Sequence, residues 1–366
     1  MEDIPTIFIV SFLGLVLGLF FGITAQRTNF CTMGAISDVV FMGDWNRFRA
    51  WMLSIAVAII GSQALHISGI LDLGNSIYLN PNLGWVGAII GGLLFGFGMT
   101  LAGGCGNKTL VRLGAGNLKS LVVVLFIGIF AYMTLRGITG LARVEIENAF
   151  NTNLEIFGMT DQSLPAFIHL FGFTDLAARL GILVIIVGGL LGFVFKSAEF
   201  RASKTDLIGG LFIGLMVPAA WYVTGVLGVD DFEPTPLTSL SFVAPVGESI
   251  QYLMTFTGST INFGVAVVFG VIFGSFISAK LTGDFRIEAF TDPNDMLRHM
   301  IGGSIMGIGG VMALGCTVGQ GITGMSTLAA GSLLALLAIL LGGYFGMKYM
   351  EEGTYSGALR AIFARQ

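Results

Sequence analysis

The chain has 366 residues, of which 54% are hydrophobic and only 11% are charged, and its formal net charge is -4. Its mean hydropathy is +0.86. Soluble domains carry about 25% charged residues, so this composition excludes an ordinary soluble enzyme and indicates a polytopic membrane protein. The three cysteines include no C-x-x-C pair, so the sequence favours neither a disulfide framework nor a zinc ribbon.

Nine apolar stretches are candidates for membrane spans, each of which needs ~20 mostly apolar residues. In chain order they are about 5–24, 50–70, 84–103, 118–138, 180–196, 206–228, 261–280, 299–314 and 327–348. We therefore predict an all-α polytopic membrane protein with about nine transmembrane helices.

Two further segments, near 25–46 and near 237–258, stay rather apolar although neither half of them is long enough to span. Apolar segments of 10–14 residues are often re-entrant. Non-helical backbone at that depth is tolerated where it is buried in protein or lines a cavity. We predict that both segments are broken, re-entrant elements that dip toward the middle of the membrane.

Basic residues gather after the first, third, fifth and seventh predicted spans and at the end of the chain. They are Arg27, Arg47, Arg49, Lys108, Arg112, Lys119, Lys196, Arg201, Lys204, Lys280, Arg286, Arg298, Lys348, Arg360 and Arg365. Lys and Arg concentrate on the cytoplasmic side of membrane proteins. This pattern predicts that the N-terminus lies outside the membrane and that the C-terminus lies in the cytoplasm.

A glycine-rich segment that ends in a cysteine occurs twice in the chain. A shift of 211 positions places Gly104 and Cys105 on Gly315 and Cys316, together with several preceding glycines. Repeats of this kind should be sought before local structure is assigned. The same shift places Cys31 on Phe242, so the third cysteine has no counterpart.

The predicted topology makes the two copies run through the membrane in opposite directions. Inverted-topology repeats are a common transporter architecture, with sites near the midplane between the halves. We predict a first repeat over 1–140, an outer segment with a connecting span over 141–204, a second repeat over 205–350 and a cytoplasmic tail over 351–366. Cys105 and Cys316 are expected to meet near the midplane, with Cys31 as an additional station.

The cysteines are the first candidates for a functional site. A free cysteine in a membrane helix is often only a small buried hydrophobe. Here Cys31, Cys105 and Cys316 all lie at predicted helix breaks, and Gly104 and Gly315 would let a ligand or another backbone approach closely. A short helix that begins after each cysteine would offer free N–H groups and partial positive charge to an anion.

Hydroxyl and basic side chains complete the candidate site. Thr109 and Thr317 follow two of the cysteines and could donate to a solute. Arg27, Lys280 and Arg286 lie near the inner ends of two spans. Positive-inside topology explains most such residues, and a role at the inner mouth, toward an anionic solute or partner, is the alternative.

Other kinds of site find no support in the sequence. His66, His169 and His299 show no metal-ligand spacing, and the chain has no Walker motif and no haem motif. We therefore expect no metal, no cofactor and no nucleic-acid partner, and contact with membrane lipid.

With these residues in view, the chain resembles the YeeE/YedE family of bacterial sulfur-compound transporters. The resemblance covers nearly the whole length and rests on four motifs. They are QRTNFC at 26–31, AGGCGNKTLVRLGAG at 102–116, GSFISAKLTGDFR at 274–286 and GCTVGQG at 315–321.

The resemblance implies an hourglass-shaped inverted repeat whose path is lined by Cys31, Cys105 and Cys316, along which thiosulfate passes from thiol to thiol. It also implies a cytoplasmic TusA-like sulfur carrier, here expected to be a separate protein. The second motif departs from the first by reading Leu-Gly-Cys in place of Gly-Gly-Cys.

The resulting hypothesis is uptake of thiosulfate or a related reduced-sulfur anion across a bacterial inner membrane, without an enzymatic reaction. In that membrane the outside N-terminus is expected to be periplasmic. Transport of another sulfur or selenium species is one alternative. A membrane thiol oxidoreductase is another, although the absence of a C-x-x-C pair argues against it. A third is a sulfur-linked channel component that requires a partner subunit.

Overall fold

The computed structural model describes residues 5–169, 172, 174–230 and 235–363, and these residues are mostly helical. The α-helices are α1 (Thr6–Thr28), α2 (Thr32–Ser37), α3 (Asn46–Ile67), α4 (Trp85–Leu101), α5 (Gly106–Gly114), α6 (Leu118–Arg136), α7 (Ile138–Phe150), α8 (Leu164–His169), α9 (Asp175–Phe195), α10 (Ala198–Ala202), α11 (Lys204–Tyr222), α12 (Val243–Met254), α13 (Phe263–Thr282), α14 (Pro293–Met312), α15 (Ala330–Glu352) and α16 (Tyr355–Phe363). Arg365, used above in the topology prediction, lies outside the described residues.

Short elements connect or extend the helices. The 3-10 and π-helical segments are η1 (Asp38–Met42), η2 (Leu73–Asn75), η3 (Ile77–Leu79), η4 (Leu154–Phe157), η5 (Val223–Leu227), η6 (Phe256–Gly258) and η7 (Gly319–Gly324). Two two-residue strands, β1 (Asn82–Leu83) and β2 (Thr152–Asn153), pair antiparallel.

Eight helices, or runs of consecutive helices, among the described residues are long and apolar enough to cross a membrane. They match eight of the nine predicted spans. The ninth prediction, 299–314, corresponds to α14, whose first turns carry Asp295 and Arg298 and lower its hydropathy. Since α14 packs against both α4 and α6, it is part of the bundle. The predicted all-α polytopic fold class is confirmed.

Four parallel helix pairs form the frame of the bundle: α1 with α13, α3 with α11, α4 with α15 and α6 with α14. Glycines set the spacing. A Cβ added to Gly14 would meet Phe263, and one added to Gly22 would meet Val271, so α1 and α13 advance in the same direction. Glycine contacts give the same direction in the other pairs. Small residues allow such close backbone approach between membrane helices.

These pairs are related by the sequence repeat. In chain order α1, α2, α3, α4 and α6 correspond to α11, α12, α13, α14 and α15. Under this correspondence the pair α1–α13 becomes α11–α3, and the pair α4–α15 becomes α14–α6. The matched helices α4 and α14 pack antiparallel, because Gly91 faces Gly309 and Gly98 faces Gly302. This geometry supports the inverted repeat, whose boundaries stay predictions.

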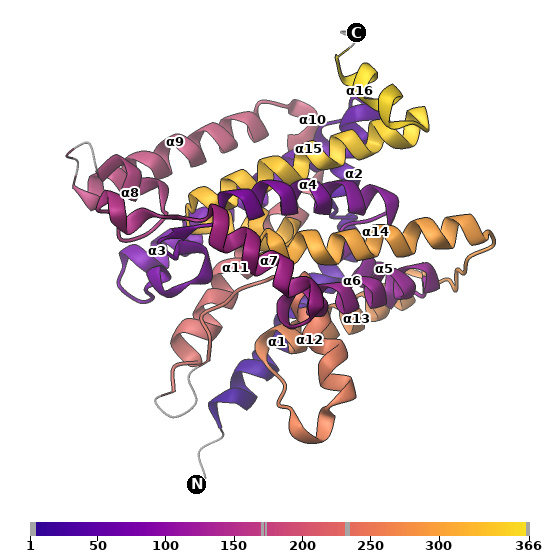
Figure 1. Cartoon of the computed structure of the whole chain (residues 1–366), viewed down its shortest axis with the longest axis horizontal. Helices are drawn as coiled ribbons and strands as arrows, with labels where there is room; N and C mark the ends of the chain where they lie inside the picture. The colour runs from indigo at the N-terminus through magenta and orange to yellow at the C-terminus, as the bar shows by residue number, and fades with distance from the viewer. Residues whose placement is uncertain (1–4, 170–171, 173, 231–234, 364–366) are drawn as a thin grey trace.

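Helix α9 stands apart from this symmetry. It packs mainly on α3 and α8, and Figure 1 shows it along one edge of the molecule, while α4, α14 and α15 lie side by side in the centre. The predicted connecting role of the fifth span agrees with this position.

Both segments predicted to be re-entrant contain non-helical residues before a helix. In the first, α1 ends at Thr28 and the chain resumes as α2 and η1 after three residues. In the second, residues 235–242 form neither helix nor strand, and α12 begins at Val243. Their re-entrant path stays a prediction.

Candidate functional site

Four residues related by the repeat each lie directly before a short helix. Cys31 precedes α2, Cys105 precedes α5, Phe242 precedes α12, and Cys316 precedes the helical segment 317–326. All four side chains are buried. Three thiols and one phenyl ring therefore lie at helix starts, where backbone N–H groups lack intrahelical partners. The repeat relates Cys31 to Phe242 and Cys105 to Cys316.

The thiols of Cys31 and Cys105 are in contact, with their Sγ atoms 3.6 Å apart. The Gly34 N–H donates to Cys31 Sγ at 3.5 Å, and the Cys105 thiol donates to Asn107 Oδ1 at 2.8 Å. The two helix breaks thus present their sulfur atoms to one another. The sequence predicted instead a central pair of Cys105 and Cys316. The contact depends on how the break after α1 packs on α5, which the repeat pattern does not encode.

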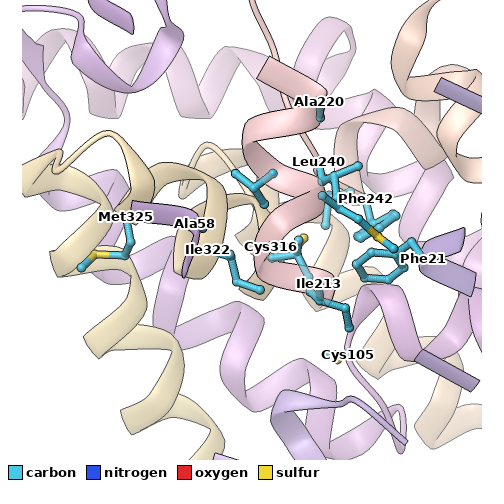
Figure 2. Close-up of a cluster of buried hydrophobic side chains, with 14 of the residues drawn as sticks. Phe21, Ala58, Cys105, Ile213, Ala220, Leu240, Phe242, Cys316, Ile322 and Met325 are labelled. Atoms are coloured by element: carbon cyan, nitrogen blue, oxygen red, sulfur yellow. The ribbon is translucent and has the colours of Figure 1, made fainter. Parts of the chain in front are cut away.

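Cys316 lies in a more apolar part of the same buried cluster. The Gly319 N–H donates to its Sγ at 3.4 Å. Figure 2 shows Phe242 and Phe21 beside it, and these two rings pack with centroids 5.0 Å apart. The Cβ of Phe242 also lies 3.9 Å from the position of a Cβ added to Gly106. Phe242 therefore lies between the surroundings of Cys316 and those of Cys105.

A cavity of about 290 Å³ opens on the Cys316 side. Leu314 and Gly315 line it just before Cys316, and Ser239 and Ser241 line it just before Phe242. Its lining includes no basic residue among the described residues. The predicted topology places this cavity, here called the outer cavity, on the periplasmic side.

Two adjoining cavities, of about 490 and 600 Å³, open on the Cys31–Cys105 side and share Gln26, Asn29 and Asp284. We call them together the inner vestibule. Its lining is rich in charge: Arg27, Lys108, Arg112, Lys119, Asp284, Arg286, Glu288, Asp295, Arg298 and His299. The linings of the outer cavity and of the inner vestibule share no residue, and neither includes one of the three cysteines.

The role of Gly104 and Gly315 in close approach stays a prediction, and the structure adds a feature of the turn before each of them. Gly103, one position before Gly104, has φ +68°. Its counterpart Leu314 has φ 57°, although leucine rarely adopts the left-handed region. The backbone turn is therefore the same in both copies, and the departure from Gly-Gly-Cys does not alter it. A Cβ on Gly104 would make only ordinary contacts, and one on Gly315 would lie 3.2 Å from Gln320.

The two predicted hydroxyls differ. Thr109 Oγ1 donates to the Gly106 carbonyl at 2.7 Å, so it is used within its own helix. Thr317 is fully buried, and its Oγ1 has no hydrogen-bond partner among the described residues. Thr317 is thus the hydroxyl that is left to interact with a solute.

The three predicted basic residues do not form one cluster. Arg27 and Arg286 line the inner vestibule. Lys280 is exposed and lies over the Phe285 ring, with its Nζ 4.0 Å from the centroid, and it lines neither cavity of the vestibule. Two of the three therefore line the inner vestibule, and their role toward a solute or partner stays a prediction.

The sequence reasoning missed Lys108, which it treated as a topology signal. The Lys108 side chain is only 8% exposed, and its Nζ donates to Asn29 Oδ1 at 2.8 Å. Its place three residues after Cys105 was a usable signal, because residues three apart share a helix face. Among the described residues, no group of three or more His, Cys, Asp or Glu side chains could hold a metal ion.

Comparison with known proteins gives the family. A model of the family described as "Sulphur transport" matches residues 27–345, which include all three cysteines. The chain belongs to the sulphur-transport family. The resemblance to YeeE/YedE proteins is thereby confirmed, and the chain is a multi-pass membrane protein of this family.

Individual relatives agree with this assignment. The thiosulfate transporter TsuA of Escherichia coli K12 is 29% identical over 342 residues, 90% of this chain and 91% of the relative. The protein of the same name from Spirochaeta thermophila is 28% identical over 346 residues, 90% of this chain and 96% of the relative. A probable transporter, YedE of Escherichia coli K12, is 35% identical over 102 residues, 27% of this chain and 23% of the relative.

Proposed function

We propose that this protein imports thiosulfate, or a closely related reduced-sulfur anion, across a bacterial inner membrane by a relay of thiols. One observation carries the proposal: the buried cysteines occupy helix starts between an outer cavity and an inner vestibule, and two of them touch. The relatives named thiosulfate transporters support the same solute class.

In this mechanism the solute enters the outer cavity and meets Cys316, with the Thr317 hydroxyl beside it. It then passes Phe242 and reaches the Cys31–Cys105 pair. A thiol is a weak donor and a sulfur atom a weak acceptor, so each step exchanges one weak S–H···S contact for another. Weak contacts at several positions suit transport, because a tightly held solute would not leave.

Net uptake needs an energy source. Moving an anion into a negative interior costs about 2.3 kcal/mol per charge for each 100 mV of membrane potential. For a dianion the cost is roughly 4.6 kcal/mol per 100 mV. Consumption of the solute by a separate TusA-like sulfur carrier at the cytoplasmic face would draw the flux inward. The exposed basic residues around the inner vestibule offer such a carrier a docking surface, and Arg286 lies at this rim.

Cys105→Ala tests the relay. We expect uptake of labelled thiosulfate to fall at least tenfold in cells that lack other importers, because the mutation removes the thiol that contacts Cys31. Ser304→Ala is the matched control, since that hydroxyl donates to the Met300 carbonyl within its own helix. The Cys105→Ala protein should remain monodisperse in detergent. Unchanged uptake in a well-folded variant contradicts the relay.

Transport of another sulfur or selenium anion is the first alternative. Competition by unlabelled anions during thiosulfate uptake ranks the solutes, and a competitor that is stronger than thiosulfate would identify a different physiological substrate.

A membrane thiol oxidoreductase is the second alternative, and the 3.6 Å separation of the Cys31 and Cys105 sulfur atoms favours it as a second candidate. A persulfide, or a disulfide between these residues, that accumulates during turnover and is detected by mass spectrometry would support the enzyme. Uptake by the purified protein alone in liposomes would exclude a channel component that requires a partner subunit.

A further inference from the structure

We infer that Lys108 and Asn29 form an anion site that holds the oxyanion end of the solute while its sulfur end faces Cys31 and Cys105. The inference rests on the proposed function and adds to it a charged binding site with a defined orientation of the solute. It starts from the position of Lys108 in the fold.

Lys108 is a buried cation without a carboxylate partner. It is 8% exposed, it lies in the membrane-spanning run Trp85–Gly114, and the described residues include no ion pair to it. Its Nζ donates to the neutral amide of Asn29. A charge at such depth is unfavourable unless a partner compensates it, and intramembrane charges mark solute pathways. A passing anion would supply the missing negative charge.

Several neighbouring charged residues of the vestibule have partners. Asp295 pairs with Lys119 at 2.9 Å and with Arg298 at 2.6 Å. Glu288 accepts from Asn117, and Arg112 donates to the Gly103 carbonyl at 2.6 Å. Lys108 differs from the arginines of the vestibule in its burial, since Arg27, Arg112 and Arg286 are exposed to solvent, which screens their charge.

The geometry links this cation to the thiol pair. Lys108 lies three residues after Cys105 on α5, and Asn29 lies two residues before Cys31 at the break after α1. The Lys108–Asn29 hydrogen bond and the Cys105–Cys31 contact therefore join the same two segments side by side. A small anion with a sulfur atom at one end and oxygens at the other can contact both pairs at once.

The site is present in one repeat only. The shift of 211 positions places Lys108 on Gly319, beside Cys316. The inner end therefore has a buried cation, whereas the described lining of the outer cavity has no basic residue and includes Glu248. This asymmetry gives the inner end an anion-binding site that the outer end lacks, while the net direction of transport still depends on the driving force.

The test measures anion binding to the purified full-length protein by titration calorimetry, with thiosulfate and with sulfate as separate probes. Lys108→Gln should weaken binding of both anions at least tenfold, and Lys108→Arg should recover most of it. Lys119→Gln is the matched control in the same vestibule, and it should change affinity less than twofold. Equal affinity in Lys108→Gln, or an equal loss in Lys119→Gln, overturns the site.

A second variant keeps Lys108 but pairs its ammonium group with an internal carboxylate, so that the group is no longer free to bind an anion. Asn29→Asp supplies an internal carboxylate to the same ammonium, and Asp tolerates the left-handed backbone at this position, where φ is 51°. Binding of both anions should fall as in Lys108→Gln, although the fold gains an ion pair. Unchanged anion affinity in this variant contradicts the proposal.

A comparison of Cys105→Ala with Lys108→Gln tests the anion site independently of the relay. Cys105→Ala should abolish thiosulfate uptake and leave sulfate binding within twofold of the wild type, because sulfate uses only the charge. If Cys105→Ala loses uptake while Lys108→Gln binds both anions normally, the relay stands and the anion site fails. If Lys108→Gln loses binding while Cys105→Ala transports normally, the anion site stands and the relay fails.

Discussion

At the scale of single residues, the backbone turn before each cysteine is conserved between the two copies despite different side chains. Gly103 and Leu314 have φ values of 68° and 57°. The left-handed region is unfavourable for an L-residue with a Cβ by roughly 1–2 kcal/mol. Leu314 is 45% exposed at the outer cavity, so the packing of its side chain does not offset this strain fully. The turn is therefore imposed by the surrounding helices.

Gly103→Ala should lower the free energy of unfolding by about 1 kcal/mol, because alanine meets the left-handed penalty that glycine avoids. Gly104→Ala is the control one position later, where an added Cβ meets only ordinary contacts at 3.6 Å and beyond. Thermal unfolding of the purified variants in detergent compares the two. A larger loss in Gly104→Ala would show that position 104, not 103, is the constrained one.

At the scale of the helices, glycine acts as a spacer along the four parallel pairs. A Cβ on Gly18 would clash with the Val267 carbonyl oxygen, which belongs to the backbone and cannot move aside as a flexible side chain could. A Cβ added to Gly188 on α9 would meet no atom of another described segment within 4 Å. Glycine therefore has different roles in α1 and α9, although the sequence pattern is similar.

Gly18→Val should separate α1 from α13 and destabilise the protein by about 1–3 kcal/mol, the usual range for overpacking. Gly188→Val, on the open face of α9, should leave the stability of the monomer unchanged. The yield of monodisperse protein and its thermal unfolding midpoint measure the effect. Equal behaviour of the two variants would contradict the packing of α1 on α13 described here.

At the scale of the whole molecule, the outer cavity and the inner vestibule lie at opposite ends of a closed, cysteine-containing core. The parallel and antiparallel helix pairs fix the relative directions of the spans. The absolute orientation rests on the basic residues around the vestibule, which the positive-inside rule places in the cytoplasm.

That orientation predicts the accessibility of introduced thiols in a variant whose three native cysteines are replaced. Thr235→Cys, in the outer cavity, should react with a membrane-impermeant maleimide added to spheroplasts whose inner membrane is sealed. Arg286→Cys, in the inner vestibule, should react only after permeabilisation. The reverse labelling pattern would contradict the predicted topology and would place the basic vestibule on the outer side of the membrane.

The sequence by itself determined the class of protein, the positions of the spans, their relative directions and the cysteine at each helix break. These features follow from local composition, from periodic glycines and from loop charge, all of which are readable along the chain. The shift of 211 positions also relates Cys31 to Phe242, and in the structure both residues directly precede a helix, although the repeat boundaries stay predictions.

The tertiary structure alone decided which residues meet. Cys105 contacts Cys31 rather than its repeat partner Cys316, and Lys108 reaches Asn29 across the bundle. These contacts depend on how the break after α1 packs against α5, at a sequence separation of 74 residues for the two thiols. Spacing along a chain carries no information on such packing, so the paired thiols and the buried cation beside them emerge only when the helices are assembled.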